Sequence, residues 1–384
     1  MAPSTAQSAI AVQAPGFHAF HADANINYQL NRFLIAGREN MFRAIGHQLS
    51  DFEDWQTEFL ARAYECEAAG ELDVAAQLYR AAEFFISPRN PERRRAYERF
   101  FDLFYRAHPE LVAARIEIPY AGRRLHALRI RTSGVARGTI VIHAGFDAYI
   151  EEFVDIGRFF GAAGYEVVMF DGPGQGTTLM RDGLPMTADW EKPVTATLDH
   201  LGIADATLLG ISLGGCLALR AAAAEPRIKR VIAFDVMLDF FQCVASRRGR
   251  IAEAALTWLT QRGRPSTINT LLQVLMRHDL YTRWGIEQGM HAFGAATPAD
   301  FFDQLRHYET RSVSPRLTQH VLVMAGEEDH FVPIYQYHEQ MALLANARSA
   351  TGRIFTRAEN GHAHCQIGNL PLAIDVMLKW VQAH

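Results

Sequence analysis

The stretch of the chain most able to do chemistry is GISLG, residues 210–214, in which Ser212 stands between two glycines. The apolar run 206–211 before it predicts a buried strand, and a helical pattern starts at Leu213. A serine in the pattern G-x-S-x-G between a strand and a helix lies on a strained turn with its hydroxyl exposed to a carbonyl substrate. Ser212 could instead cap the helix, but the context on both sides favours a nucleophile.

A serine hydroxyl is a weak nucleophile at neutral pH, so it needs a basic histidine, which in turn needs a carboxylate to orient it. After this kind of turn the acid comes next along the chain and the histidine comes last. Asp329 follows the apolar run VLVMAG and stands four residues before Pro333. We predict Asp329 as the acid, with Glu327 and Glu328 of the same loop as competing candidates.

Two histidines follow in the loop ENGHAHCQ, between the last predicted strand and the last predicted helix. Either His362 or His364 could accept the serine proton, because both come after Asp329 in the required order. The spacing leaves both histidines open, although only one of them can be the base.

Acyl transfer also needs N–H donors that stabilise the negative oxygen of the tetrahedral intermediate. The backbone N–H of Leu213, directly after the serine, supplies one. The loop HAGF, which begins at the end of the predicted strand 139–143, supplies the second. We place this second donor at Phe146, with Gly145 as the alternative.

A second glycine cluster, FDGPGQG at residues 170–176, looks superficially like a phosphate-binding loop. It lacks the spacing G-x-G-x-x-G directly between a strand and a helix, and no Walker lysine follows it. We therefore predict a tight loop that packs beneath the site, in which Asp171 is structural.

The elements that must position these residues are predicted from periodicity. Strands rich in Val, Ile and Leu alternate with helices over 111–235 and again over 316–384, which predicts a mainly parallel sheet with helices on both faces. Residues 1–110 and the insertion 236–315 have helical periodicity. The expected fold class is α/β, with a helical N-terminal segment and a helical cap insertion. The basic cluster PERRRAYERF, residues 91–100, is predicted to be a solvated helix face.

The composition is that of an ordinary globular protein, with 49% hydrophobic and 21% charged residues and a net charge of −4. That charge favours no binding to nucleic acid or anionic lipid, and no segment is apolar over the length of a bilayer. The four cysteines have no zinc-site spacing, so we expect no metal and no cofactor, only a small-molecule substrate. The N-terminus has no basic residue before Arg32 and no unbroken apolar core, which argues against a secretory signal and favours a cytoplasmic protein.

The order Ser212, Asp329 and His364, with the stretches HAGFDAYIEE, FDGPGQG, LMRDGLPMTADWEKPV, GISLGG and HCQIGN, resembles one branch of the α/β hydrolases. This branch contains 2,6-dihydroxypseudooxynicotine hydrolase and the fungal yellowish-green polyketide-shortening hydrolases. The resemblance spans nearly the whole chain, including the N-terminal stretch EAAGELDVAAQLYRAAEFF. It implies the α/β-hydrolase fold.

The resemblance also implies several properties of the site. It selects His364 as the base, because the base of the relatives directly precedes a cysteine, as in HCQ. It implies that the segment 1–110 and the insertion 236–315 wall the substrate pocket, and that an auxiliary acid, Asp235 or Asp239, stands near it. It further implies a possible homodimer and cleavage of a carbon–carbon bond next to a ketone.

We therefore expect a cofactor-free serine hydrolase that acts on an aromatic or polyketide-like ketone. A carboxylester or thioester hydrolase would use the same residues and differ in its products. A non-catalytic binding protein, with the helical N-terminus as its interaction module, is the alternative from another class. The order of the three candidate residues along the chain argues against it.

Overall fold

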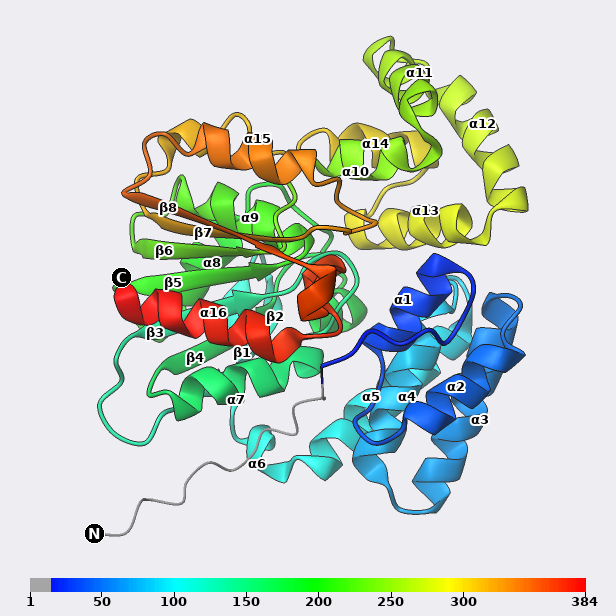
Figure 1. Ribbon diagram of the computed structural model, residues 1–384, viewed down its shortest axis with the longest axis horizontal. Coiled ribbons are helices and arrows are strands. Elements are labelled where there is room, and N and C mark those ends of the chain that lie inside the picture. The colour runs from blue at the N-terminus through cyan, green and yellow to red at the C-terminus, as the bar shows by residue number, and fades with distance from the viewer. Residues whose placement is uncertain (1–14) are drawn as a thin grey trace.

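A central sheet organises the chain. The computed structural model describes residues 15–384, apart from the side chain of Arg248. The strands are β1 (Arg115–Tyr120), β2 (Arg123–Ile130), β3 (Thr139–His143), β4 (Glu166–Asp171), β5 (Ala206–Ile211), β6 (Ile228–Phe234), β7 (His320–Gly326) and β8 (Ser349–Phe355). They lie in the order β1-β2-β4-β3-β5-β6-β7-β8 (Figure 1), with β1 and β2 antiparallel to their neighbours and the other strands parallel to one another. The mainly parallel sheet predicted from the alternation of elements is confirmed.

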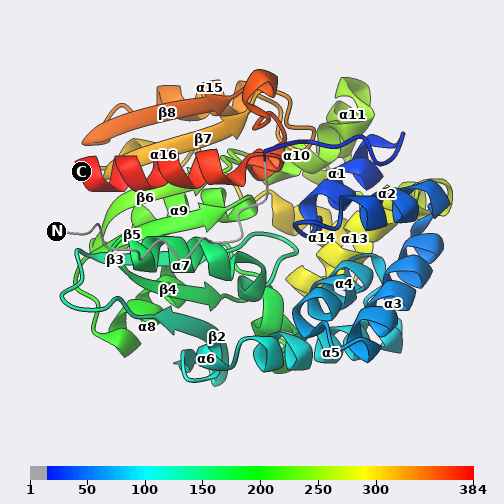
Figure 2. The same cartoon turned by 60° about the horizontal axis from the view of Figure 1, so that its bottom comes forward.

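Helices cover both faces of this sheet, as Figures 1 and 2 show. They are α7 (Val154–Ala162) and α16 (Leu370–Ala383) on one face and α8 (Glu191–Leu201), α9 (Leu213–Ala222) and α15 (Tyr335–Leu343) on the other. Each face therefore buries its own hydrophobic core.

Strand β5 shows why the sequence folds into a sheet that is covered twice. All six of its residues are buried. Leu209 and Ile211 belong to the core beneath α7 and α16, whereas Leu208 belongs to the core on the opposite face. Successive side chains of a strand point to opposite faces, so a continuous apolar run is stable only where helices cover both sides.

Within residues 15–384, six helices precede the sheet, and all but the last of them pack at one end of it (Figures 1 and 2). They are α1 (Ala24–Arg32), α2 (Glu39–Gln48), α3 (Phe52–Ala68), α4 (Leu72–Phe85), α5 (Pro91–Ala107) and α6 (Pro109–Val112). Trp55 of α3 is fully buried, and its indole N–H donates to the carbonyl oxygen of Ala81 in α4 at 2.7 Å. The apolar side chains of these helices continue into the core beneath α7 and α16, so the helices and the sheet share one core.

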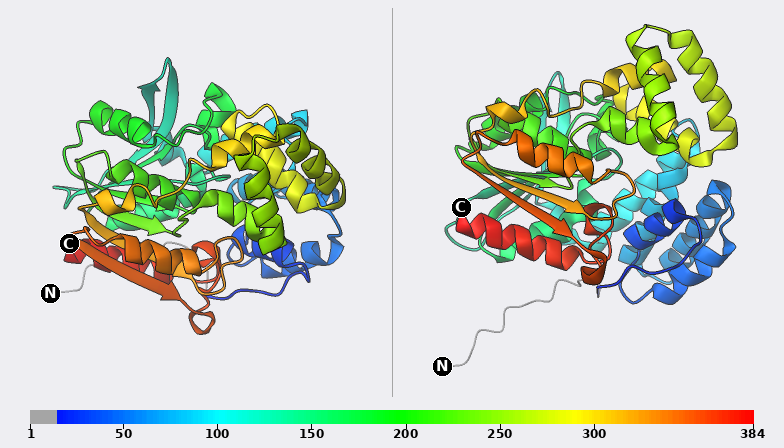
Figure 3. Two further views of the ribbon diagram at one scale, coloured as in Figure 1. Left: turned by 90° about the horizontal axis from the view of Figure 1, so that it is seen from above. Right: turned by 45° about the horizontal axis from the view of Figure 1, so that its top comes forward.

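Five further helices lie between β6 and β7. They are α10 (Phe240–Ala245), α11 (Arg250–Gln261), α12 (Pro265–His278), α13 (Leu280–Phe293) and α14 (Pro298–Leu305). Helices α11 and α12 project from the rest of the molecule (Figure 3) and expose large apolar side chains such as Ile251 and Trp258. The insertion and the N-terminal helices occupy the same end of the sheet, one above the other (Figures 1 and 3).

The structure corrects one prediction about α5. The cluster PERRRAYERF is not entirely a solvated helix face, because Arg93 is buried. Its Nε–H donates to Glu83 in α4 at 2.6 Å, and an Nη2–H donates to Gln288 in α13 at 2.8 Å. Arg94 and Arg95 are exposed as predicted. Periodicity could not show that an acid on a neighbouring helix compensates the charge of Arg93.

No helix in the part of the chain that the structure describes is both long and apolar enough to cross a bilayer. Most of the N-terminal stretch that we considered as a secretory signal, residues 1–14, lies outside the described residues.

Candidate active site

Ser212 stands at the sharp turn between β5 and α9. Its backbone has φ 61° and ψ −126°, and residues with a side chain rarely adopt a positive φ. A Cβ at Gly210 would lie 1.9 Å from the carbonyl oxygen of Gly214, and a Cβ at Gly214 would lie 2.6 Å from that of Ala144. Both glycines are therefore required by close backbone contacts, and the strained turn presents the serine at the edge of the sheet.

Three side chains that are far apart in the sequence form a hydrogen-bonded row at the carboxyl edge of the sheet. The Oγ of Ser212 lies 2.8 Å from Nε2 of His364, and Nδ1 of His364 lies 2.5 Å from Oδ2 of Asp329. Asp329 follows β7, and His364 starts the short 3₁₀ turn η6 (His364–Gln366) that follows β8. This arrangement can pass a proton from the hydroxyl to the imidazole.

His364 is buried, Ser212 and Asp329 are half-buried, and the charges of the row interact strongly. Burial opposes the charged form of His364, but the Asp329 carboxylate beside it raises the pKa of the imidazole well above its ordinary value. Burial also opposes ionisation of Asp329, yet the charge of His364 and the N–H donors of Val332 and Phe331 lower the pKa of this carboxyl. Asp329 can therefore stabilise the imidazolium that forms when His364 takes a proton.

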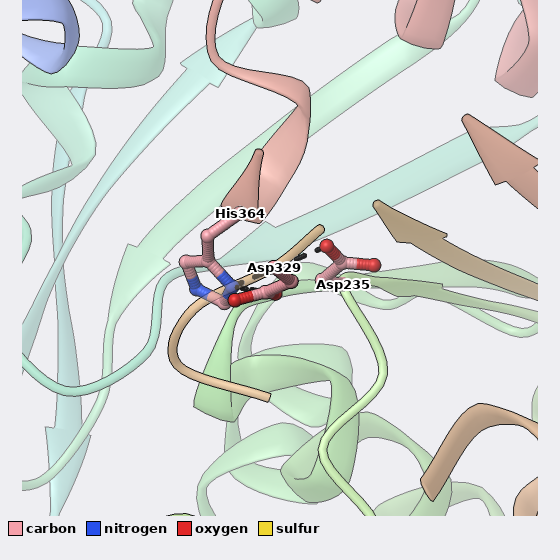
Figure 4. Close-up of side chains that lie close together, drawn as sticks. All are labelled: Asp235, Asp329 and His364. Atoms are coloured by element: carbon pink, nitrogen blue, oxygen red, sulfur yellow. Dashed lines mark hydrogen bonds and ion pairs between the residues drawn. The ribbon is translucent and has the colours of Figure 1, made fainter. Parts of the chain in front are cut away.

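A second carboxyl group lies close to the same imidazole (Figure 4). Asp235 directly follows β6, and its Oδ2 lies 4.0 Å from Nδ1 of His364. This oxygen accepts the backbone N–H of Cys365 and an Nε2–H of Gln366, both at 3.2 Å. Burial and the charge of Asp329 raise the pKa of Asp235 well above its ordinary value, which favours its neutral form. Of the two candidates for the auxiliary acid that the resemblance implies, Asp235 is the one near the row.

The other candidate acids, one for the auxiliary role and two for the role of Asp329, interact with other groups. Asp239 caps α10 and forms an ion pair with Arg311 at 2.6 Å. Glu327 accepts the backbone N–H of Arg357 at 2.5 Å, and Glu328 forms an ion pair with the side chain of Arg357. These contacts leave Asp329 as the acid of this loop that bonds to a histidine.

The competing histidine also lies outside the row. His362 is buried, and its ring packs edge-on against Phe17, with 5.2 Å between ring centres. His364, two residues further on, makes both hydrogen bonds of the row. The geometry therefore agrees with the choice that the resemblance implies.

Two side chains of the row, Asp329 and His364, form with Asp235 the candidate group for a metal site. Within residues 15–384, Asp235, Asp329 and His364 form the only group whose potential ligand atoms all lie within 4.8 Å of one another (Figure 4). Oδ2 of Asp329 and Nδ1 of His364 already bond to each other. A metal would have to break this bond, so the arrangement suits proton transfer better than coordination.

The loop after β3 lies against the serine turn. A Cβ at Gly145 would lie 2.8 Å from the backbone nitrogen of Leu213 and 3.1 Å from Cβ of Ser212, so glycine permits the close approach. Within the described part of the chain, the backbone N–H groups of Leu213 and Phe146 have no hydrogen-bond acceptor. Two N–H donors without partners beside a nucleophile can bind a developing oxyanion.

The glycine-rich loop after β4 supports the loop after β3. Nε2 of Gln175 donates to the carbonyl oxygens of Ala144 at 2.5 Å and Gly145 at 3.0 Å. Asp171 accepts the backbone N–H groups of Ile150 and Thr177, which is the structural role that the sequence predicted for it. Sequence reasoning did not identify Gln175, because nothing in its neighbourhood shows which carbonyl groups it contacts.

Tyr28 of α1 reaches the site from the N-terminal helices. Its hydroxyl donates to the backbone carbonyl oxygen of His364 at 3.2 Å. Its ring packs against His330 and Phe331, with 4.9 and 5.2 Å between ring centres. Sequence reasoning missed this contact, which joins residues 336 positions apart.

Ser212 and His364 line a cavity of about 870 Å³, a volume typical of small-molecule sites. Tyr28 and Phe33 contribute to its wall from the N-terminal helices, and Phe240 from the insertion. Most of the lining is apolar, so the row of three side chains faces a space suited to an organic molecule.

Known proteins resemble this chain in sequence. Residues 138–362 match the family model of the alpha/beta hydrolase fold. Hydrolase acrC of Aspergillus aculeatus is 29% identical and is aligned over 89% of this chain and 87% of its own length. The 20-hydroxy-prefusarin hydrolase FUS2 of Gibberella moniliformis is 29% identical over 80% of this chain and 79% of its own.

Solved structures share the architecture. The structure of 2,6-dihydroxy-pseudo-oxynicotine hydrolase is similar over 92% of this chain and 93% of its own, with a TM-score of 0.62 at 20% identity. AbyA5 is similar over 91% and 90%, with a TM-score of 0.64 at 19% identity. The resemblance and the fold class predicted from the motifs are confirmed. Since the family model spans more than half of the chain, the protein belongs to the α/β hydrolase family and is a hydrolase.

Proposed function

We propose that this hydrolase uses Ser212 as nucleophile, His364 as general base and Asp329 as the acid that orients the imidazole. The observation that carries the proposal is the row of hydrogen bonds beside the cavity, 2.8 Å from Oγ to Nε2 and 2.5 Å from Nδ1 to Oδ2. A proton on Nδ1, directed at the carboxylate, leaves Nε2 free to accept the serine proton.

The reaction begins when Oγ of Ser212 attacks a carbonyl carbon and Nε2 of His364 takes the hydroxyl proton. The N–H groups of Leu213 and Phe146 stabilise the oxyanion of the tetrahedral intermediate. When the intermediate collapses, the leaving group takes the proton from the imidazolium and the acyl group stays on the serine. Water that is deprotonated by the same imidazole then releases the acyl group as an acid.

The bond that we propose to be cleaved is a carbon–carbon bond next to a ketone, in an aromatic or polyketide-like substrate. Two similar proteins are named as hydrolases of single organic compounds, 20-hydroxy-prefusarin and 2,6-dihydroxy-pseudo-oxynicotine. Aromatic side chains line the cavity from both helical segments, among them Phe33, Tyr281 and Trp284. Such side chains pack well against flat, conjugated substrates.

Cleavage of a carbon–carbon bond requires a stabilised leaving group, because an ordinary carbanion is too basic to depart. A second carbonyl or an electron-poor ring next to the bond delocalises the negative charge until His364 delivers its proton. The net reaction adds water across the bond and gives an acid together with a ketone or an arene. We therefore expect an activated ketone, such as a 1,3-diketone or an acyl phenol.

We also propose that residues 1–110 and 236–315 form two walls of one pocket around the hydrolase core, 111–235 and 316–384. Cavity-lining side chains from both helical segments support this division. The substrate would then enter between the N-terminal helices and the insertion.

The products of a substrate panel test the proposed chemistry. We expect aryl ketones or 1,3-diketones to yield an acid together with a ketone or an arene, as identified by mass spectrometry. If only esters or thioesters react, yielding an alcohol or a thiol with the acid, the protein is an ester or thioester hydrolase that works on the same residues.

Variants test the residues. A fluorophosphonate probe should label the wild type but not Ser212→Ala, whose kcat on any substrate should fall by about 10⁴-fold or more. His362→Ala is the matched control for His364→Ala, and only the latter should inactivate the enzyme. A wild-type protein that neither reacts with the probe nor turns over any substrate would instead be a binding protein.

A further inference from the structure

Among the described side chains, four arginines line the cavity, and three of them already have acidic partners. The ion pairs are Arg32 with Asp147 and Glu152, Arg80 with Glu83 and Glu152, and Arg158 with Asp155 and Glu110. A guanidinium in such a pair has its charge compensated by the protein itself. The fourth, Arg247, has a different environment.

Arg247 lies in the short 3₁₀ turn η3 (Ser246–Arg248) that joins α10 to α11, and its side chain is exposed. An Nη2–H donates to Oδ1 of Asn25 in α1 at 2.9 Å. The guanidinium carbon lies 5.1 Å from the ring centre of Tyr281 and 5.3 Å from that of Phe331. Among the residues that the structure describes, no carboxylate lies within ion-pair distance of Arg247.

Two acidic residues of the same region, Asp23 and Asp279, cap helices. Asp23 accepts the backbone N–H groups of Asn25 and Ile26 as the cap of α1. Asp279 caps α13 through the N–H of Thr282.

Arg247 lies near the row of three side chains. Phe331 lies between them, with its ring centre 5.3 Å from the guanidinium carbon and 5.2 Å from the ring centre of His364. Apolar side chains of the insertion form much of the cavity lining near Arg247. These side chains include Met237, Phe240, Leu256, Leu259, Leu272 and Leu275.

We infer that Arg247 binds a carboxylate of the substrate, so that this hydrolase prefers a molecule with a carboxylate at one end and an apolar chain or ring at the other. The inference rests on the proposed serine hydrolase function and names the substrate class for that site. A guanidinium has five N–H donors in a planar fork, and Asn25 occupies one of them. The remaining donors match the two oxygens of a carboxylate, while the two rings hold the guanidinium by cation–π contact.

Paired esters test this preference. The mono-p-nitrophenyl esters of succinic, adipic and suberic acid each carry a free carboxylate, which their methyl-capped counterparts lack. We expect Arg247→Met to lower kcat/KM for the best carboxylate ester by about tenfold at low salt, and by less than about twofold for its methyl-capped form. The difference should shrink as salt is added, because the site is exposed. Arg247→Lys should keep part of the preference, since it retains the charge without the fork.

The matched control is Arg262→Met. Arg262 belongs to the same insertion and stacks on Trp258, 5.2 Å from its ring centre, but it does not line the cavity. This variant should leave both rates unchanged. The inference is overturned if Arg247→Met leaves the ratio of the two kcat/KM values as it is in the wild type, or if Arg262→Met changes that ratio equally.

A binding measurement separates this inference from the proposed function. Calorimetry on Ser212→Ala compares monomethyl suberate, which has one carboxylate, with dimethyl suberate, which has none. Tighter binding of the acid that disappears in Ser212→Ala/Arg247→Met supports the role of Arg247, even if the enzyme turns over no ester. Equal affinities for the acid and the diester in Ser212→Ala would refute it, whatever the fate of the serine mechanism.

Discussion

Replacement of Asp329 by asparagine tests the hydrogen-bonded row at its shortest bond. Oδ2 of Asp329 lies 2.5 Å from Nδ1 of His364, and Oδ1 accepts the N–H groups of Phe331 at 2.7 Å and Val332 at 3.0 Å. Asparagine keeps one oxygen for these two N–H groups, so its amide NH₂ faces Nδ1. Because two donors cannot share a hydrogen bond, the imidazole adopts the tautomer with its proton on Nε2 and cannot accept the proton of Ser212.

The expected fall in kcat of Asp329→Asn has two causes. A hydrogen bond to a charged group contributes about 1.5–3 kcal/mol, or roughly tenfold to hundredfold in rate. The wrong tautomer adds a second loss, because only a small fraction of the molecules then carries a competent base. We expect kcat for p-nitrophenyl butyrate to fall by about 10³- to 10⁴-fold, with a far smaller change in KM. The melting temperature should change little, since the backbone N–H groups keep their acceptor.

The pH dependence of the same variant has a defined direction. The Asp329 carboxylate raises the pKa of His364, and only the neutral imidazole can act as a base. In the wild type, kcat/KM should therefore rise with pH through a midpoint above the ordinary histidine value of about 6.5. Removal of the negative charge removes the cause of the shift, so the midpoint of Asp329→Asn should move to lower pH.

Asp235 provides the control for this prediction. Asp235→Asn leaves the direct bond intact and should cost less than about tenfold in kcat. In the Asp329→Asn background, Asp235 is the remaining carboxyl near Nδ1 of His364, at 4.0 Å, so the double variant should lose about another tenfold. The reasoning is refuted if Asp329→Asn keeps more than about a tenth of the wild-type kcat with an unchanged pH midpoint. If Asp235→Asn alone abolished activity, Asp235 would be the acid.

Three further predictions concern residues that support the site. Gln175→Leu removes the donor to two carbonyl groups of the loop after β3. Because this loop carries an oxyanion donor, kcat should fall by about tenfold to hundredfold. A change confined to KM would contradict this role. Tyr28→Phe removes the hydrogen bond to the carbonyl of His364 and should lower the free energy of unfolding by about 1 kcal/mol, as measured by chemical denaturation. An unchanged free energy of unfolding would show that this contact does not stabilise the fold. Deletion of residues 1–105 uncovers apolar parts of the shared core and should cause insolubility or loss of substrate binding. If the truncated protein were instead an active monomer in sedimentation analysis, the N-terminal helices would be an independent appendage.

The sheet was predictable where strands are buried on both faces. Strand β7 appears in the sequence as a continuous apolar run and is buried along almost its whole length. Strand β8 lies at the edge of the sheet and is only partly buried, so its residues form no continuous apolar run. It starts at Ser349, because pairing with β7 extends it over residues that periodicity does not mark.

The candidate site was predictable where its geometry is local. The turn around Ser212 needs glycine on both sides because backbone atoms of the same short stretch approach each other there. The choice between His362 and His364 is not local in this sense. It depends on the direction in which one loop presents two side chains, and the spacing of the residues left it open.

The sequence by itself determined the elements, the order of the chemistry-bearing residues and the turn that carries the serine, because periodicity and steric contact act between near neighbours. Only the tertiary structure decided which histidine bonds to Asp329, that Gln175 and Tyr28 support the site, and that Arg247 alone among the cavity arginines of the described chain lacks an acidic partner. These contacts join residues up to 336 positions apart, and each depends on the distance and direction between side chains that folding alone establishes.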